Sequence, residues 1–169
     1  VSDAAGNAAA QVTSSSFSVD TGLPSISAIG TSALSWGAVL NATEDNNNGT
    51  VTVTTVAVED GQTVTVTLNS ATYTATTSSN SASVTITASG LQALTDGATY
   101  TLTADVSDAA GNAAAQVTSS SFSVDTTLPS ISAIGTTAFS WGAVLNEQET
   151  NSATISVTTV GVEDGQTLS

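Results

Sequence analysis

The chain has 169 residues, none of them Lys, Arg, His, Cys or Met, and its 14 acidic residues give a formal net charge of −14. Without His, Cys or Lys it has no common general base, thiol nucleophile or Schiff-base amine, so we do not expect an enzyme. The lack of cationic side chains disfavours nucleic acid as a partner. No apolar run approaches the ~20 residues of a membrane helix, so membrane insertion is not expected.

The sequence repeats itself with a period of about one hundred residues, since residues 1–41 match residues 106–146 at 38 of 41 positions. A period of this length is the size of a small domain rather than of a solenoid rung. We therefore expect residues 21–125 to form one complete repeat. Residues 1–20 are expected to be the last loop and strand of a preceding repeat, and residues 126–169 the first strands of a following one.

The only two prolines, Pro24 and Pro129, lie at equivalent positions of the repeat. They close the segments 19–24 and 124–129, which we interpret as short linkers between repeats. Proline cannot donate a ladder hydrogen bond, so it separates the strands on either side and stiffens the junction.

In chain order, alternating apolar residues predict seven strands in the complete repeat, called A to G: 25–40, 50–58, 63–69, 71–77, 82–88, 98–106 and 113–124. Strand A is expected to break at Gly30, and strand B to contain a bulge near Thr54–Thr55. A tight turn is expected at Asn69–Ser70, and one helical turn near 91–94. The pattern predicts an all-β fold of tandem immunoglobulin-like seven-strand β-sandwich repeats, with Trp36 in the core.

Two rows rich in Thr, at positions 63, 65, 67 and 83, 85, 87, are expected on the outer faces of the sheets. The simplest interpretation is a solvated face made of residues that favour strands. Direct binding of ice or glycan through these rows is an alternative.

Several acidic residues are expected to gather at one end of the sandwich. Because successive strands alternate in direction, the incoming linker and the B–C, D–E and F–G loops share that end. The residues predicted there are Asp20 from the linker, Glu59 and Asp60 from the B–C loop, Asp105 at the end of strand F, and Asp108 and Asn112 from the F–G loop. Unpaired carboxylates repel one another, and Ca²⁺, which binds six to eight oxygen atoms, would remove that repulsion.

The same placement recurs in the other copies, as Asp125, Glu163 and Asp164 in the third and as Asp3 and Asn7 in the first. The alternative is that all of these are ordinary solvated turn residues. At the opposite end, the loop 44–49 together with Asp96 is a candidate for a second, weaker cation site, although a variable solvated loop is the simpler interpretation.

Three segments resemble a known family: Val-Asp-Thr-Thr-Leu-Pro at 124–129, Ser-Asp-Ala-Ala-Gly-Asn at 107–112 and Val-Glu-Asp-Gly-Gln-Thr at 58–63. They are similar to the bacterial immunoglobulin-like extender repeats of giant calcium-dependent adhesins of the RTX type, and among these to the extender repeats of marine ice-binding adhesins. The resemblance implies a stalk on the bacterial cell surface whose junctions are stiffened by calcium. It implies these calcium ligands in the complete repeat: Asp20, Glu59, Asp60, Asp108 and Asn112. The first linker departs from the pattern at Gly22, which we expect to loosen that junction.

The leading hypothesis is therefore an extracellular structural extender that projects a distal adhesive domain. Its expected partners are neighbouring repeats of the same chain and calcium ions, and the chain is expected to be an extended monomer. Two alternatives remain at this stage: an adhesive module that binds glycan or ice directly, and a surface-layer or filament subunit whose unpaired strand edges exchange between chains.

Overall fold

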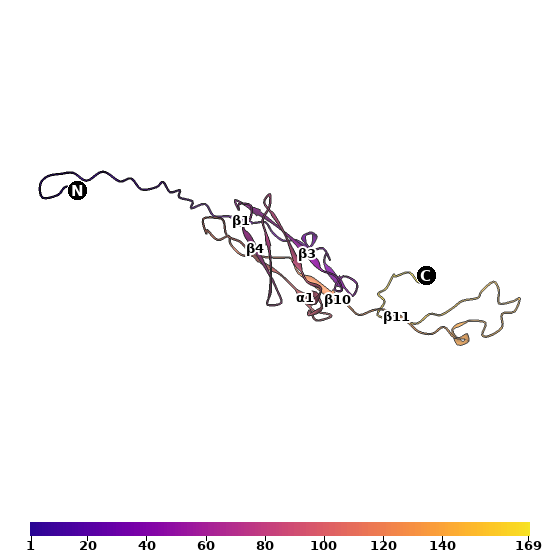
Figure 1. The fold of residues 1–169 in the computed structure, drawn as a ribbon. Coiled ribbons are helices and arrows are strands. Elements are labelled where there is room, and N and C mark those ends of the chain that lie inside the picture. The colour runs from indigo at the N-terminus through magenta and orange to yellow at the C-terminus, as the bar shows by residue number, and fades with distance from the viewer.

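The structure is a computed structural model that describes residues 1–169. The molecule is elongated, with a folded β-sandwich in the middle, an extended N-terminal segment leaving one end and a thin C-terminal segment leaving the other (Figure 1). We call the end that the linker 19–24 reaches the upstream end, and the end that the chain leaves after Asp125 the downstream end. No helix in the structure is long and apolar enough to cross a lipid bilayer.

The sandwich has two layers. The smaller layer has the order β1 (Ser25–Ile26), β3 (Gly49–Val56) and β6 (Ser81–Ile86). The larger layer contains the sheet β5 (Ala71–Thr76), β4 (Thr63–Leu68), β8 (Thr103–Asp105) and β9 (Val117–Thr118). It is continued by β2 (Val39–Asn41), β10 (Phe122–Asp125) and β7 (Thr99–Tyr100), in which β10 pairs parallel to β2. The predicted all-β, immunoglobulin-like sandwich is confirmed.

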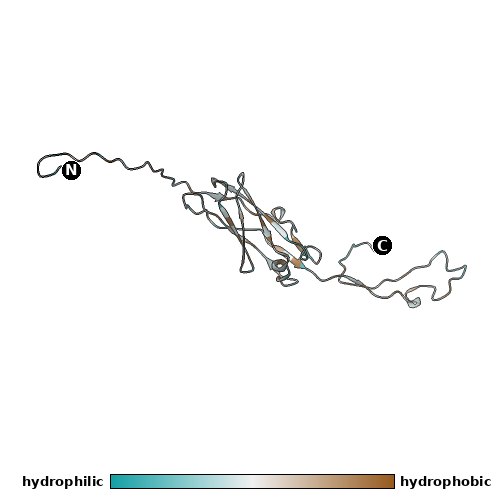
Figure 2. Cartoon of the chain, viewed as in Figure 1, coloured by the Kyte–Doolittle hydropathy of each residue, from teal (hydrophilic) through white to brown (hydrophobic).

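The core lies between the two layers and is built almost entirely from aliphatic side chains. Twenty-one buried hydrophobic residues form one cluster, and all of them lie between Ile26 and Val124. The alternation in β4 buries Val64, Val66 and Leu68, as the sequence predicts. Apolar segments accordingly follow the strands of the sandwich (Figure 2). Trp36 is buried, as predicted, and its ring meets Phe122 edge to face at 5.4 Å between centroids.

Strand B departs from the prediction. No bulge occurs at Thr54–Thr55, because β3 keeps a regular register with β6 through Thr54 and then pairs with β1. Thr55 points into the core and Val56 is 57% exposed, so the alternation continues with a polar residue inside. The chain changes direction only at Ala57, whose φ of 56° turns Val58 back into the core.

Other strands are broken or placed differently from their expected spans. Strand A is broken at Gly30 as predicted, where a 3-10 turn, η1 (Thr31–Ala33), begins and separates β1 from β2. Strands F and G are each divided in two, as β7 with β8 and β9 with β10. The predicted turn at Asn69–Ser70 is present, with φ of 47° and 66° at the two residues, and it pairs β5 with β4 in full register. The helical turn begins earlier than expected, as α1 (Ala88–Gln92).

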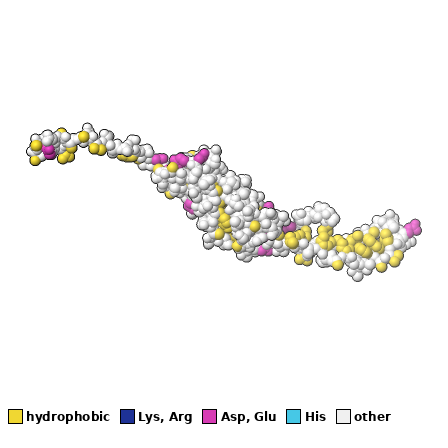
Figure 3. Space-filling view, viewed as in Figure 1, with side chains coloured by type: hydrophobic (Ala, Val, Ile, Leu, Met, Phe, Trp, Pro, Cys, Tyr) yellow, Lys and Arg dark blue, Asp and Glu magenta, His cyan; other side chains and the backbone are white.

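The segments outside the sandwich contain little regular structure. Residues 1–20 have one isolated bridge, Ser2 with Ala8. Residues 126–169 contain β11 (Ser130–Ile131), η2 (Thr136–Ala138) and β12 (Thr159–Val160), in which β11 and β12 pair antiparallel. Hydrophobic side chains are visible along this C-terminal segment (Figure 3).

Candidate junction sites at the two ends of the sandwich

Hydrogen bonds connect the linker and the loops at the upstream end. The Glu59 carboxylate, in the β3–β4 loop, accepts a hydrogen bond of 2.9 Å from the backbone N–H of Ala109 in the β8–β9 loop. The side-chain amide of Asn112 in that same loop donates to the backbone carbonyl of Asp20 in the linker at 3.2 Å. Acidic residues gather on the surface where the N-terminal segment meets the sandwich (Figure 3). The expected meeting of the linker with these two loops is thus observed for Asp20, Glu59, Asp108 and Asn112.

Asp108 is the most enclosed acid of this group, with 5% of its surface exposed. Its two carboxylate oxygens accept from the side-chain amide of Asn112 at 2.8 Å and from the backbone N–H of Asn112 at 2.7 Å. These bonds, the side-chain one first, lower the pKa of Asp108 below its ordinary value of 3.8. The loop therefore holds a charged carboxylate close to the linker.

The β3–β4 loop is shaped by Thr77, a buried residue just after β5. Its hydroxyl donates to the backbone carbonyl of Glu59 at 2.6 Å and accepts from the backbone N–H of Gln62 at 3.0 Å. The backbone N–H of Gly61, where φ is 89°, donates to the Thr77 carbonyl at 2.8 Å. Sequence reasoning missed Thr77, because a Thr in a Thr-rich strand has no distinguishing signal.

Asp60 and Asp105 point to other partners. The Asp60 carboxylate accepts from the backbone N–H of Ser79 at 2.7 Å, which ties the β3–β4 loop to the β5–β6 turn. The Asp105 carboxylate accepts two hydrogen bonds, of 3.0 and 2.9 Å, from the side-chain amide of Gln116. Both carboxylates therefore bond to residues outside the set of Asp20, Glu59, Asp108 and Asn112.

The first copy repeats the local geometry of the β8–β9 loop without the rest of the site. Asp3 accepts from the backbone N–H and the side-chain amide of Asn7, each at 2.9 Å. The same two bonds, the side-chain one first, lower the pKa of Asp3. Both residues are exposed.

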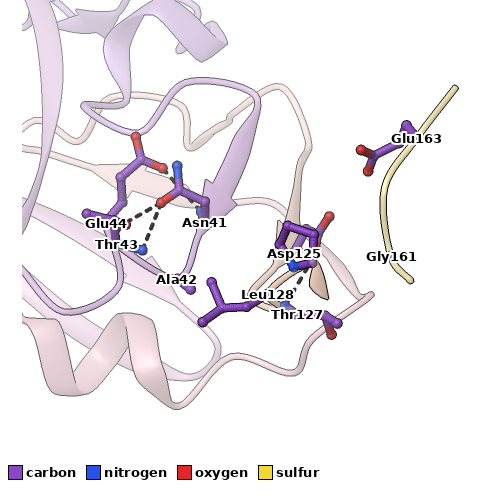
Figure 4. A pocket seen from close by; sticks show the side chains of 10 residues that line it. Asn41, Ala42, Thr43, Glu44, Asp125, Thr127, Leu128, Gly161 and Glu163 are labelled. Carbon is purple, nitrogen blue, oxygen red and sulfur yellow. Dashed lines mark hydrogen bonds between the residues drawn. The ribbon is translucent and has the colours of Figure 1, made fainter. Parts of the chain in front are cut away.

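At the downstream end, a cavity of about 520 Å³ separates the sandwich from the segment that follows it. Glu44, Asp125 and Glu163 line it together with the polar side chains of Asn41, Thr43 and Thr127 (Figure 4). Glu44 accepts from the backbone N–H of Asn41 at 3.1 Å. Asp125 and Glu163 thus line one cavity together with Glu44 of the sandwich, whereas Asp164 is absent from its lining.

Asp96 lies at the same end but holds the linker instead of facing that cavity. It accepts from the backbone N–H of Thr126 at 2.7 Å and from the hydroxyl of Thr127 at 2.6 Å. The pKa of Asp96 is lowered by these bonds, chiefly by the one from the Thr127 side chain.

The chemistry available at both ends is that of oxygen donors. Carboxylates, an amide and a backbone carbonyl come from separate chain segments at the upstream end, and each bonded carboxylate oxygen keeps a further lone pair. Such donors fit a hard cation such as Ca²⁺. No three acidic side chains lie close enough together in the structure to form a complete metal site by themselves.

Similar sequences were found among solved structures, whereas no family model and no curated protein matches the chain. A bacterial immunoglobulin-like domain from the M. primoryensis ice-binding adhesin is 31% identical, over 62% of this chain and 97% of that domain, with a TM-score of 0.42. A structure from a 1.5-MDa bacterial ice-binding adhesin, described for its host cell surface retention, is 30% identical, over 75% of this chain and 40% of that one (TM-score 0.43).

A third structure is a Ca²⁺-stabilized adhesin that helps an Antarctic bacterium reach out and bind ice. It is 32% identical, over 79% of this chain and 33% of that one, with a TM-score of 0.44. The chain therefore spans less than half the length of the two larger structures. Of the three, the M. primoryensis domain is the one that the match covers over nearly its whole length.

Proposed function

Because the chain belongs to the bacterial immunoglobulin-like domains of ice-binding adhesins, we propose that it is a structural extender segment of a large secreted adhesin. In this role residues 21–125 form one complete repeat, and residues 1–20 and 126–169 belong to its two neighbours. The segment lies outside the cell, performs no catalysis, and spaces a distal adhesive domain from the surface. Its elongated form, with linkers at opposite ends of one sandwich, supports this role (Figure 1).

We propose that calcium ions stiffen the junctions. The observation that supports this most is the meeting of Asp20, Glu59 and Asp108 at the upstream end of a chain that contains no Lys, Arg or His. A similar adhesin is described as Ca²⁺-stabilized. When bound, calcium would supply the missing positive charge and link the linker to the two loops.

The ligands at the upstream end are the carboxylates of Glu59 and Asp108, together with Asp20. The Asn112 amide oxygen joins them only if the side chain turns, because its amide nitrogen now faces Asp108 and Asp20. Asp60 and Asp105 join only if they leave Ser79 and Gln116, their present partners. The further proposed ligands are Asp125 and Glu163 at the downstream junction, with Asp164 only if it moves to the cavity that they line. In the first copy they are Asp3 and Asn7.

The test compares the 169-residue chain in calcium, in magnesium and in EDTA. Calcium at about one hundred times its dissociation constant is expected to stabilise the sandwich by roughly 2.7 kcal/mol, because it binds only the folded arrangement. Differential scanning calorimetry measures the melting temperature, and small-angle scattering measures the maximum dimension. An equal melting temperature and an equal maximum dimension in calcium and EDTA would refute the calcium part of the proposal.

Two matched variants assign the site. Glu59→Gln removes a charge at the upstream end and should weaken the calcium response. Glu147→Gln removes a charge at an exposed position of the segment beyond the downstream linker and should leave the response unchanged. Equal responses from the two variants would mean that calcium acts elsewhere.

A second candidate function is direct adhesion through a Thr-rich face. β4 and β5 place three Thr pairs opposite one another on the outer face: Thr63 with Thr76, Thr65 with Thr74, and Thr67 with Thr72. Ice-affinity and glycan-array measurements on the chain distinguish this function from a purely structural one. If the parent chain binds ice or a glycan and Thr65→Lys does not, adhesion through this face is favoured. If the parent chain binds neither, the structural extender function is the one that remains.

A further inference from the structure

The loop between α1 and β7 forms a fixed platform where the chain leaves the sandwich. Leu94 is buried beneath it, and the backbone N–H of Thr95 donates to the Tyr100 hydroxyl at 3.0 Å. The same loop pairs with the end of β10: Gly97 N–H donates to the Val124 carbonyl at 2.8 Å, and Val124 N–H donates to the Ala98 carbonyl at 2.9 Å. Asp96 therefore stands on backbone that is tied to the core.

Both carboxylate oxygens of Asp96 hold the outgoing linker. One accepts from the backbone N–H of Thr126 and the other from the hydroxyl of Thr127, at 2.7 and 2.6 Å. Hydrogen bonds to an ionised acceptor are shorter and stronger than those between neutral groups. Two of them on consecutive residues restrict the rotation of the linker just after β10 ends at Asp125.

We propose that Asp96 is a positioning residue that fixes the direction of the outgoing linker without a metal ion, and that the residue at position 127 sets how firmly it does so. The role of Asp96 in a stalk rests on the extender function proposed above, but its hydrogen bonds to the linker do not depend on calcium. The lowered pKa of Asp96 accords with this geometry, since the bonds favour the charged carboxylate.

The two linkers of the chain differ at this position. In both, the fourth residue of the linker forms a turn with the Asp two positions before it: Thr127 N–H donates to Asp125 at 3.3 Å, and Gly22 N–H donates to Asp20 at 2.9 Å. Gly22 has no hydroxyl, so a carboxylate facing it receives one bond fewer than Asp96 receives. Successive junctions of one stalk would therefore differ in stiffness, with the more flexible ones set by a single Thr-to-Gly replacement.

The experiment uses the 169-residue chain in EDTA, with variants Asp96→Ala and Thr127→Gly, the latter copying the first linker. Thr127→Ser keeps the hydroxyl and is the rescue variant. Amide exchange at Thr126, followed by NMR, reports the backbone contact. Since the chain has no Cys, spin labels at Ser83→Cys and Ser132→Cys report the distance distribution across the linker.

We expect the Thr126 amide to exchange roughly tenfold faster in Asp96→Ala, the equivalent of losing about 1.4 kcal/mol of one hydrogen bond. The distance distribution should broaden in Asp96→Ala and Thr127→Gly and should stay as in the parent chain in Thr127→Ser. The melting temperature of the sandwich should not change in Thr127→Gly, because that variant removes no core atom. A merely structural Asp96 would change the melting temperature without broadening the distribution.

Unchanged exchange and unchanged distributions in Asp96→Ala would overturn the proposal. If Asp96→Ala also lowers the melting temperature, the distance distribution of Thr127→Gly decides between the outcomes. A broadened distribution supports the proposal, and an unchanged one overturns it. Distance distributions that broaden in the two variants in EDTA, together with no calcium effect on the parent chain, would support the role of Asp96 and contradict the calcium proposal. The two proposals therefore fail separately.

Discussion

The side-chain amide of Asn112 donates to the backbone carbonyl of Asp20, which lies 92 positions earlier in the chain, while it also donates to the Asp108 carboxylate. One amide thus connects the linker, before the first strand of the sandwich, to the loop before its last strands. The orientation of the incoming linker is therefore coupled to the fold of the sandwich even where no metal ion takes part.

We predict that Asn112→Ala frees the linker and raises the pKa of Asp108 toward its ordinary value of 3.8, because the largest cause of the lowering is removed. A carbon-13 NMR titration of the Asp carboxyl groups measures this change. The matched control is Asn7→Ala, which should raise the pKa of Asp3 in the same way. Because Asp3 lies outside the sandwich, that control should leave the melting temperature unchanged.

The pH dependence of stability follows from the same carboxylate. The folded pKa of Asp108 is lowered, so its contribution to stability is complete above the unfolded value near 3.8 and is lost as the pH falls through the lower folded value. Asn112→Ala should therefore make the melting temperature less sensitive to acidification below pH 3.8 than in the parent chain. An identical acid profile for the two chains would contradict this assignment.

We predict that Thr77→Val destabilises the sandwich by about 1–3 kcal/mol, because it removes the buried hydroxyl that accepts from the half-buried N–H of Gln62 and donates to the Glu59 carbonyl, while it keeps the volume of the side chain. Urea unfolding measures the change. The control is Thr76→Val, an exposed neighbour in β5. The variant should also respond less to calcium, since Thr77 orients Glu59.

We predict that Gly49→Ala disturbs Trp36. A Cβ atom at position 49 would lie 2.5 Å from the indole ring, and the resulting repacking should cost about 1–3 kcal/mol. The third copy carries Ala153 at the position that corresponds to Gly49. It also has Phe139 where the complete repeat has Leu34, so its Trp141 has a different neighbour from that of Trp36. Intrinsic tryptophan fluorescence and thermal unfolding measure the effect.

The control for this prediction is Gly30→Ala, where the nearest atom to a new Cβ is the Ser32 hydroxyl at 3.8 Å. That change should leave both measurements near those of the parent chain. If Gly49→Ala also leaves the fluorescence and the melting temperature unchanged, then the Trp36 ring can move aside, and its packing does not exclude a side chain at position 49.

The sequence predicts most of the fold, because alternation reports which side of a strand is buried. It could not predict Thr55 inside the core, since the hydroxyl makes Thr look like a surface residue until β1 and β6 surround it. At the upstream end, the alternation of strand direction predicts that the loop of Glu59 meets the loop of Asp108, and Glu59 bonds there to the backbone of Ala109. It could not show that Asp60 turns to Ser79, because that choice depends on one hydrogen bond across a turn.

Two identical segments of the chain show which features follow from local sequence and which need contacts between distant strands. Residues 1–20 and 106–125 have the same sequence. Asp3 with Asn7, and Asp108 with Asn112, form the same loop in both, because its hydrogen bonds join residues only four positions apart. Phe17 is nevertheless 85% exposed, whereas Phe122 is 1% exposed. Burial requires neighbouring strands from distant parts of the chain, and only Phe122 has β2 and β7 beside it.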